Sequence, residues 1–253
     1  MKKAVNWKVF LLLVSLSLVS VICVFPYVIT LQHEALSKLD ISIWFLFFAQ
    51  FIQSAILFSI LIFLGLFFIK RTQFQMPLIN AIVEKKNYSK LLKSILGISI
   101  LAGILTAVSI YALDALFSMQ GVGISTHQTY APIWQKLLAA FYGGITEEII
   151  TRLFLMSLFI WIGMKFRKQN NPSTITIIVS IFLAAIIFGL GHLPITASLI
   201  EITPLIVLRA VVLNGIGGVI FGWLFWKKGL ESAMIAHFIA DIFLLTLLPL
   251  LVK

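Results

Sequence analysis

Long apolar runs separated by short polar connections dominate this chain. An uninterrupted apolar stretch of about 18 residues or more is long enough to cross the hydrocarbon core of a bilayer as a helix. Seven such runs are present, at residues 9–31, 41–69, 94–116, 136–164, 174–191, 204–226 and 230–251. Backbone polar groups in lipid must be satisfied within the segment itself, which favours helices. The pattern therefore predicts an all-α fold, a polytopic membrane helix bundle of about seven transmembrane helices.

The composition agrees with a membrane protein and excludes other classes. Of the 253 residues, 61% are hydrophobic and only 11% are charged, far from the mixture usual in soluble domains. The single cysteine, Cys23, excludes an internal disulfide and a cysteine-based metal centre. A net charge of +10 would suit a nucleic-acid partner. We expect no nucleic acid, however, because the basic residues cluster in the short connections between apolar runs.

These basic clusters predict the orientation of the chain. Lysine and arginine concentrate in cytoplasmic connections of membrane proteins. Placing the amino terminus in the cytoplasm puts fourteen basic residues on that side. We expect an integral, multi-pass protein of a bacterial plasma membrane, with an uncleaved first span. The fourteen residues are Lys2, Lys3, Lys8, Lys70, Arg71, Lys85, Lys86, Lys90, Lys93, Lys165, Arg167, Lys168, Lys227 and Lys228.

Polar side chains divide the spans into two groups. Residues 1–125 hold three spans with few buried polar groups and the longest cytoplasmic connection, for which a short interfacial helix is expected at residues 70–93. Residues 126–253 hold four spans that carry nearly all the polar chemistry. We therefore expect an amino-terminal part that packs or admits substrate, and a catalytic-type core of four helices.

The densest polar cluster is Glu147, Glu148 and Arg152 in the fourth span. A charge at bilayer depth costs about 2.5–3.5 kcal/mol on insertion scales, so three charges within six residues need a reason. Glu148 and Arg152 are four residues apart and share a helix face, so they are expected to pair. Glu147 would then point elsewhere and have its own role. A buried ion pair that only fixes helix packing would be the simpler explanation.

Two further polar pairs occur at helical spacing. Phe188 precedes His192 by four residues at the end of the fifth span, and His237 precedes Asp241 by four in the seventh. A lone histidine at a span end is usually an interfacial residue. Two histidines and three carboxylates in apolar spans instead indicate a functional site.

The sixth span adds small residues and an arginine. Gly218 and Gly222 have the spacing of a tight helix–helix contact. Arg209, near the outer end, is expected to reach the interface or to pair with Glu201.

Together, the three motifs resemble the CPBP family, also called Abi, of intramembrane endopeptidases. This family includes the prenyl-protein CAAX proteases and bacteriocin-processing or immunity proteins. The matching pieces are Glu147-Glu148-x-x-x-Arg152, Phe188-x-x-x-His192 and His237-x-x-x-Asp241, in the family's order. One departure is the last position, where the prenyl-protein branch typically has asparagine.

The resemblance implies hydrolysis of a peptide bond within the membrane. Glu147 and His192 would activate a water molecule, since no serine or cysteine stands in an obvious nucleophile setting. His237, with Asp241, would face the oxyanion. Glu148 and Arg152 would support the site, together with Phe188. The implied partner is a membrane-associated or lipid-modified peptide in the lipid bilayer.

A metal ion is the alternative use of the same side chains. Glu147, His192 and His237 would suffice to hold a catalytic zinc with an open position. No His-Glu-x-x-His helix is present, so we favour glutamate and water and commit to no cofactor. 

Two non-proteolytic functions stay open at this point. The chain could be a bacteriocin-immunity or membrane scaffold protein that uses the cluster structurally. It could also be a transporter with an ion relay, although no repeated halves are visible in the sequence.

Overall fold

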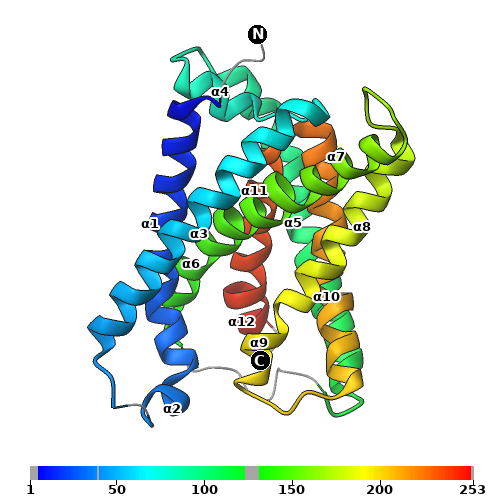
Figure 1. The fold of residues 1–253 in the computed structure, drawn as a ribbon. Helices are drawn as coiled ribbons and strands as arrows, with labels where there is room; N and C mark the ends of the chain where they lie inside the picture. Colours follow the sequence, from blue (N-terminus) through cyan, green and yellow to red (C-terminus); the bar gives the residue numbers. More distant parts are fainter. Residues whose placement is uncertain (1–4, 39, 123–130, 252–253) are drawn as a thin grey trace.

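The computed structural model describes residues 5–38, 40–122 and 131–251, and within these parts it contains helices and no strands (Figure 1). The helices that cross the bundle, with their short companions, are α1 (Trp7–Leu31), α2 (His33–Leu36), α3 (Ile43–Thr72), α4 (Pro77–Val83), α5 (Ser89–Ser118), α6 (Ile133–Phe141), η2 (Tyr142–Glu147), η3 (Ile149–Met156), α7 (Ser157–Phe166), α8 (Thr174–Gly191), α9 (Leu193–Ala197), α10 (Pro204–Lys228), α11 (Leu230–Ile242), η4 (Phe243–Leu247) and α12 (Leu248–Leu251).

Seven helical stretches among the described residues are long and apolar enough to cross a membrane, which confirms the predicted all-α, seven-span fold. The start of α1 and the last described helix, α12, lie at opposite ends of the bundle (Figure 1), as an odd number of spans requires. The orientation with the amino terminus inside stays a prediction. The spans are Trp7–Leu31, Ile43–Thr72, Ser89–Ser118, Ile133–Phe166, Thr174–Ala197, Pro204–Lys228 and Leu230–Leu250.

Side-chain caps and prolines define several helix starts. Asn6 caps α1 by accepting hydrogen bonds from the backbone amides of Lys8 and Val9. Ser173 caps α8, and Thr203 caps α10 ahead of a proline in the first turn. These oxygens satisfy amides that have no partner inside the helix.

A tight turn joins α10 to α11 and brings in the short helix α4. Gly229 takes φ +99°, a conformation open to glycine. Directly after the turn, the buried side chain of Glu231 accepts a hydrogen bond from the Ile79 amide of α4 at 2.7 Å. The interfacial helix expected within residues 70–93 is thus present as Pro77–Val83. We call this end of the bundle the basic end, because α4 and the connections at residues 165–173 and 227–229 lie there (Figure 1).

Small residues allow the core helices to approach closely. A Cβ at Gly218 would lie 2.6 Å from the Ala185 side chain, and one at Gly222 would lie 3.0 Å from Ile181. The predicted contact surface on α10 is therefore confirmed, with α8 as the partner. 

The fourth span runs diagonally through the middle of the bundle (Figure 1). Its central part, η2 and η3, consists of wide π-helical turns, which occur often at functional sites. The side chains of Ile149, Leu153, Met156 and Ile160 in this span are fully buried. Polar groups at Glu147 and Glu148 are consequently held at the centre of the protein.

The predicted partner of Arg209 was wrong. Arg209 of α10 pairs with Asp114 of α5, with Nη2 2.6 Å from Oδ1, whereas Glu201 is exposed in the connection before α10. The reason is packing, because α10 contacts α5. A partner 95 residues away could not be found from spacing on one helix.

Candidate active site

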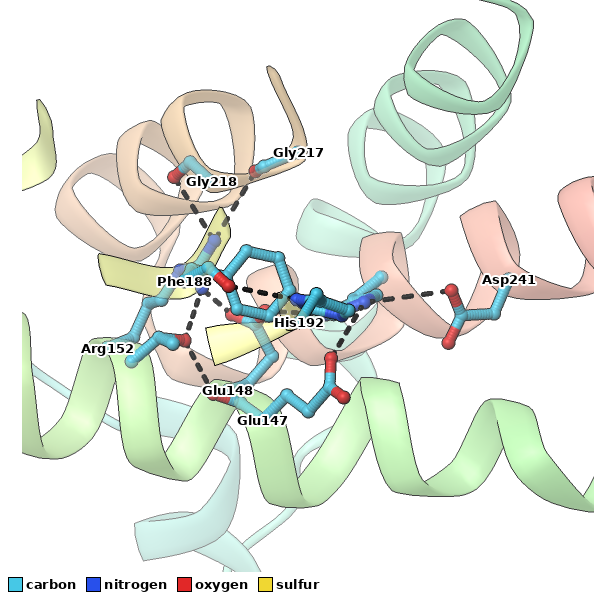
Figure 2. A network of polar contacts seen from close by, with 10 residues as sticks. Glu147, Glu148, Arg152, Phe188, His192, Gly217, Gly218 and Asp241 are labelled. Atoms are coloured by element: carbon cyan, nitrogen blue, oxygen red, sulfur yellow. Dashed lines mark hydrogen bonds and ion pairs between the residues drawn. The ribbon is translucent and has the colours of Figure 1, made fainter. Parts of the chain in front are cut away.

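Three spans supply the polar cluster at the centre of the bundle. Glu147 and Glu148 come from the π-helical part of the fourth span, His192 from the end of α8, and His237 and Asp241 from α11. Figure 2 shows Glu147 and Glu148 side by side, facing the helix that carries Asp241.

Arg152 is a fully buried charge held by an ion pair and three hydrogen bonds. Its Nε lies 3.2 Å from Oε2 of Glu148, which confirms the predicted pair. Its Nη2 donates to the carbonyl oxygens of Gly217 and Gly218 at 3.3 and 3.1 Å, and its Nη1 donates to the hydroxyl of Thr151. A buried guanidinium needs such partners to offset its desolvation. The two glycines of α10 thus do more than permit close packing, because their carbonyls bind the arginine (Figure 2).

Glu148 contacts both Arg152 and His237. Its side chain is 0% exposed, and its Oε1 accepts a hydrogen bond from Nδ1 of His237 at 2.7 Å. One carboxylate therefore fixes both Arg152 and the ring orientation of His237. A carboxylate bound to one ring nitrogen sets which nitrogen carries the proton and aims the other nitrogen at the reaction site.

The second nitrogen of His237 faces the two remaining carboxylates. Nε2 lies 3.6 Å from Oε2 of Glu147 and 3.7 Å from Oδ1 of Asp241. These distances exceed those of direct hydrogen bonds. An oxygen atom that bonds to both His237 and Glu147 can therefore lie beside this gap, as a water or a substrate oxygen would.

Aromatic rings hold the two histidines in place. The ring of His237 stacks on Phe221 with centroids 4.8 Å apart. Phe188 meets His192 edge-on at 4.7 Å and His237 at 5.8 Å, so it lies between the two predicted site histidines. The predicted sharing of a helix face by Phe188 and His192 is confirmed.

His192 presents one free ring nitrogen. Its Nδ1 donates to the carbonyl oxygen of Phe188 at 2.9 Å, because a carbonyl can only accept. In the neutral ring, Nε2 then carries a lone pair.

Glu147 lies between two cavities. A cavity of about 220 Å³ is lined by Glu147, Thr151, Phe188 and His192. A larger one of about 580 Å³ lies between α1 and α3 and is lined mainly by apolar residues together with Glu147. Tyr142 also lines both cavities. The structure thus brings together Glu147, His237 and Asp241 directly, and Glu147 with His192 through a shared cavity.

A scan against protein families gives one match, over residues 129–243, to the model described as Rce1-like, type II CAAX prenyl endopeptidase. This part of the chain is similar to the CAAX protease family. The match covers every residue of the polar cluster, and it covers a little under half of the chain. It supports the resemblance to this family that the three motifs indicate. No curated protein and no solved structure matches the chain.

Sequence reasoning missed several residues of this family site. A Cβ at Gly143 would lie 2.0 Å from Oδ2 of Asp241 and 3.1 Å from Nε2 of His237, so only glycine allows α11 to approach here. Thr146 is hydrogen-bonded to the buried Ser20 of α1. Tyr142, which lines both cavities, could have been noticed in the sequence only because it lies five residues before Glu147.

Zinc ligands are not pre-assembled in the described part of the chain. No group of three or more histidine, cysteine, aspartate or glutamate side chains there is arranged to hold a metal ion. The Nδ1 atoms of His237 and His192 are hydrogen-bonded to Glu148 and to the Phe188 carbonyl, which leaves Nε2 as the nitrogen that could bind a metal, but the three side chains are not gathered around one point. The set Glu147, His192 and His237 does not fit a zinc site in this arrangement, so no step below passes through a metal.

Proposed function

We propose that this protein hydrolyses a peptide bond of a membrane-associated peptide, using a water molecule that Glu147 deprotonates and His237 as the donor to the oxyanion. The observation that carries this proposal is the 3.6 Å approach of Glu147 to Nε2 of His237, with Glu148 fixing the opposite nitrogen. The arrangement places a base and a hydrogen-bond donor around one small space, which hydrolysis requires.

Glu147 is the proposed general base. Its side chain is 22% exposed, against 0% for Glu148, and it lines both cavities. Water and substrate can therefore reach Glu147, whereas Glu148 is occupied by Arg152 and His237. A positioned base typically contributes about 10²–10⁴-fold in rate.

His192 and His237 have different proposed roles. The lone pair on Nε2 of His192 can accept a hydrogen bond from the attacking water and orient it. His237 faces carboxylates at both nitrogens, and an imidazolium is a hydrogen-bond donor at both. It would then donate from Nε2 to the developing oxyanion, with Asp241 beside it.

The reaction follows from these positions. Water attacks the carbonyl carbon of the scissile bond while Glu147 takes one of its protons. The carbonyl oxygen becomes an oxyanion and accepts a hydrogen bond from His237. Glu147 then passes the proton to the leaving nitrogen, the carbon–nitrogen bond breaks, and the products are a carboxylic acid and an amine.

The larger cavity is the proposed path for the apolar part of the substrate. It is formed by the carboxyl-terminal part of α1 and the amino-terminal part of α3, and reaches Gln32 and Leu36 at the end of the bundle opposite the basic end. If the basic end lies in the cytoplasm, as the positive-inside rule predicts, substrate enters from the outer leaflet.

This orientation has a direct test. A topology reporter fused at Gly121 should report an extracytoplasmic position, and one at Lys168 should report the cytoplasm. The opposite result would place the cavity in the inner leaflet and reverse the side from which substrate enters.

The proteolytic proposal is tested by cleavage of a library of membrane-bound peptides by the purified protein. Glu147→Gln should lower the rate about 10²–10⁴-fold, and Glu201→Gln, which changes an exposed glutamate outside the site, should leave it unchanged. A chelator should leave wild-type activity intact. Full activity of Glu147→Gln would refute the assignment of Glu147 as the base. If the chelator abolished wild-type activity and added zinc restored it, a metal mechanism would replace this one.

A further inference from the structure

A basic cavity lies at the basic end of the bundle, and none of the residues that line it belongs to the polar cluster. It has a volume of about 520 Å³ and is formed where the last turns of α3 and α7 come together. Three cations line it, Arg71, Lys165 and Lys168, with Trp161 beside them. No acidic residue is among those that line the cavity, so no carboxylate of the lining neutralises the three cations.

Two of the three cations, Arg71 and Lys165, contact aromatic rings. Arg71 donates from Nη1 to the Phe67 carbonyl at 2.7 Å, and its guanidinium lies over the Phe67 ring at 3.4 Å. A guanidinium has five N–H donors, so most of them stay available for a ligand. Lys165 lies 5.9 Å from the centre of the Trp161 ring.

Other basic residues at this end have different surroundings. Lys86 pairs with Glu84 at 2.5 Å. Lys227 lies over the ring of Trp226 at 3.5 Å. Basic residues at helix ends can serve only as topology signals or dipole partners. Convergence of three of them on one cavity goes beyond either role, because like charges repel unless an anion lies among them.

The location specifies the kind of anion. Trp161 packs against Phe68 of α3 at 5.3 Å, so aromatic side chains continue from the cavity toward the apolar part of the bundle. Tryptophan with basic residues is typical of the headgroup level of a membrane. Basic pockets between spans on the cytoplasmic side bind anionic lipid headgroups, and the volume is that of a small-molecule site.

We propose that this cavity binds the phosphate headgroup of an anionic glycerophospholipid. Arg71, Lys165 and Lys168 would contact the phosphate, and the amides of Gln169 and Asn170, which also line the cavity, would bind the glycerol hydroxyls. The acyl chains would lie along the apolar surface next to Trp161. This site is separate from the polar cluster and does not depend on proteolytic activity.

The test is lipid retention by the purified, delipidated full-length chain. Phosphatidylglycerol and phosphatidylcholine with identical acyl chains are titrated, and bound lipid is counted by native mass spectrometry. Phosphatidylglycerol should bind preferentially. Arg71→Gln and Lys165→Gln should each weaken it about fivefold, the value of one cation near an anionic surface. Lys227→Gln removes the same charge from the same end and should change binding less than twofold.

Lys168→Gly separates binding from folding. Lys168 has φ +51° just after α7, a conformation that glycine adopts with less strain. This variant should keep or raise the thermal midpoint, while its affinity for phosphatidylglycerol should fall about fivefold.

Three results would overturn the proposal. The first is equal phosphatidylglycerol binding by wild type, Lys165→Gln and Lys168→Gly. The second is equal binding of the two lipids. The third is displacement of the lipid by millimolar inorganic phosphate, which would make the site one for a free anion.

Discussion

Two arginine–carboxylate pairs lie inside the spans of this protein, and their surroundings differ. The Arg152–Glu148 side chains are 2% and 0% exposed, whereas those of Arg209 and Asp114 are 11% and 21% exposed. The first pair extends through Glu148 to His237 and the cavity-lining Glu147. The second joins α10 to α5. A charge within a span therefore does not by itself indicate a catalytic site. The contacts that continue from Glu148 to His237 distinguish the first pair from the second.

The position of each arginine along its helix explains why the two ion pairs should differ in their contribution to stability. Arg209 lies in the second turn of α10, near the membrane surface, where a long side chain can reach water. Arg152 lies in the middle of its span and has to be satisfied within the protein. Its partners are the Gly217 and Gly218 carbonyls as well as Glu148. The outer pair can be lost with less consequence than the central one.

Removing each arginine would measure this contrast directly. Arg152→Met should lower the stability in detergent by about 3–5 kcal/mol, because it leaves Glu148 and two carbonyls without their partner. Cleavage should also be lost, since Glu148 would no longer hold His237 in place. The matched change Arg209→Met should cost about 1 kcal/mol or less and keep activity. Thermal unfolding in detergent gives both values, and equal losses would remove the distinction between the pairs.

A smaller effect is expected from crowding the central network. Gly143→Ala would place a methyl group 2.0 Å from Oδ2 of Asp241, so α11 has to shift. Overpacking of this kind costs about 1–3 kcal/mol, and the shift of His237 should lower the cleavage rate by more than the loss of stability explains.

Gly215→Ala is the matched control, because no atom lies within 4 Å of a Cβ built there. It should be neutral in both the cleavage assay and thermal unfolding. An active Gly143→Ala with unchanged stability would show that the approach of α11 is not needed.

Much of the fold followed from the sequence alone. Membrane spans are determined by length and apolarity, which are properties of local sequence, so all seven runs appeared as helices. The pair Glu148–Arg152 and the contact of Phe188 with His192 were also predictable, because each lies four residues apart on one helix. The order of the three motifs then indicated the family.

Contacts between helices were not predictable in the same way. The Asp114 partner of Arg209 and the Gly217 and Gly218 partners of Arg152 are distant in the chain. The double role of Glu148 was missed because His237 lies 89 residues away. The π-helical turns around Glu147 also escaped prediction, since sequence periodicity assumes a regular α-helix.

The central claim is that the two adjacent glutamates divide the work, with Glu147 doing chemistry and Glu148 holding the site together. The most direct test measures the thermal midpoint and the cleavage rate for Glu147→Gln and Glu148→Gln in the same preparation. Glu147→Gln should keep the wild-type midpoint and lose about 10²–10⁴-fold in rate, whereas Glu148→Gln should lose both, with a cost of about 3–5 kcal/mol for the broken buried pair. Equal destabilisation by the two changes, or an active Glu147→Gln, would contradict the claim.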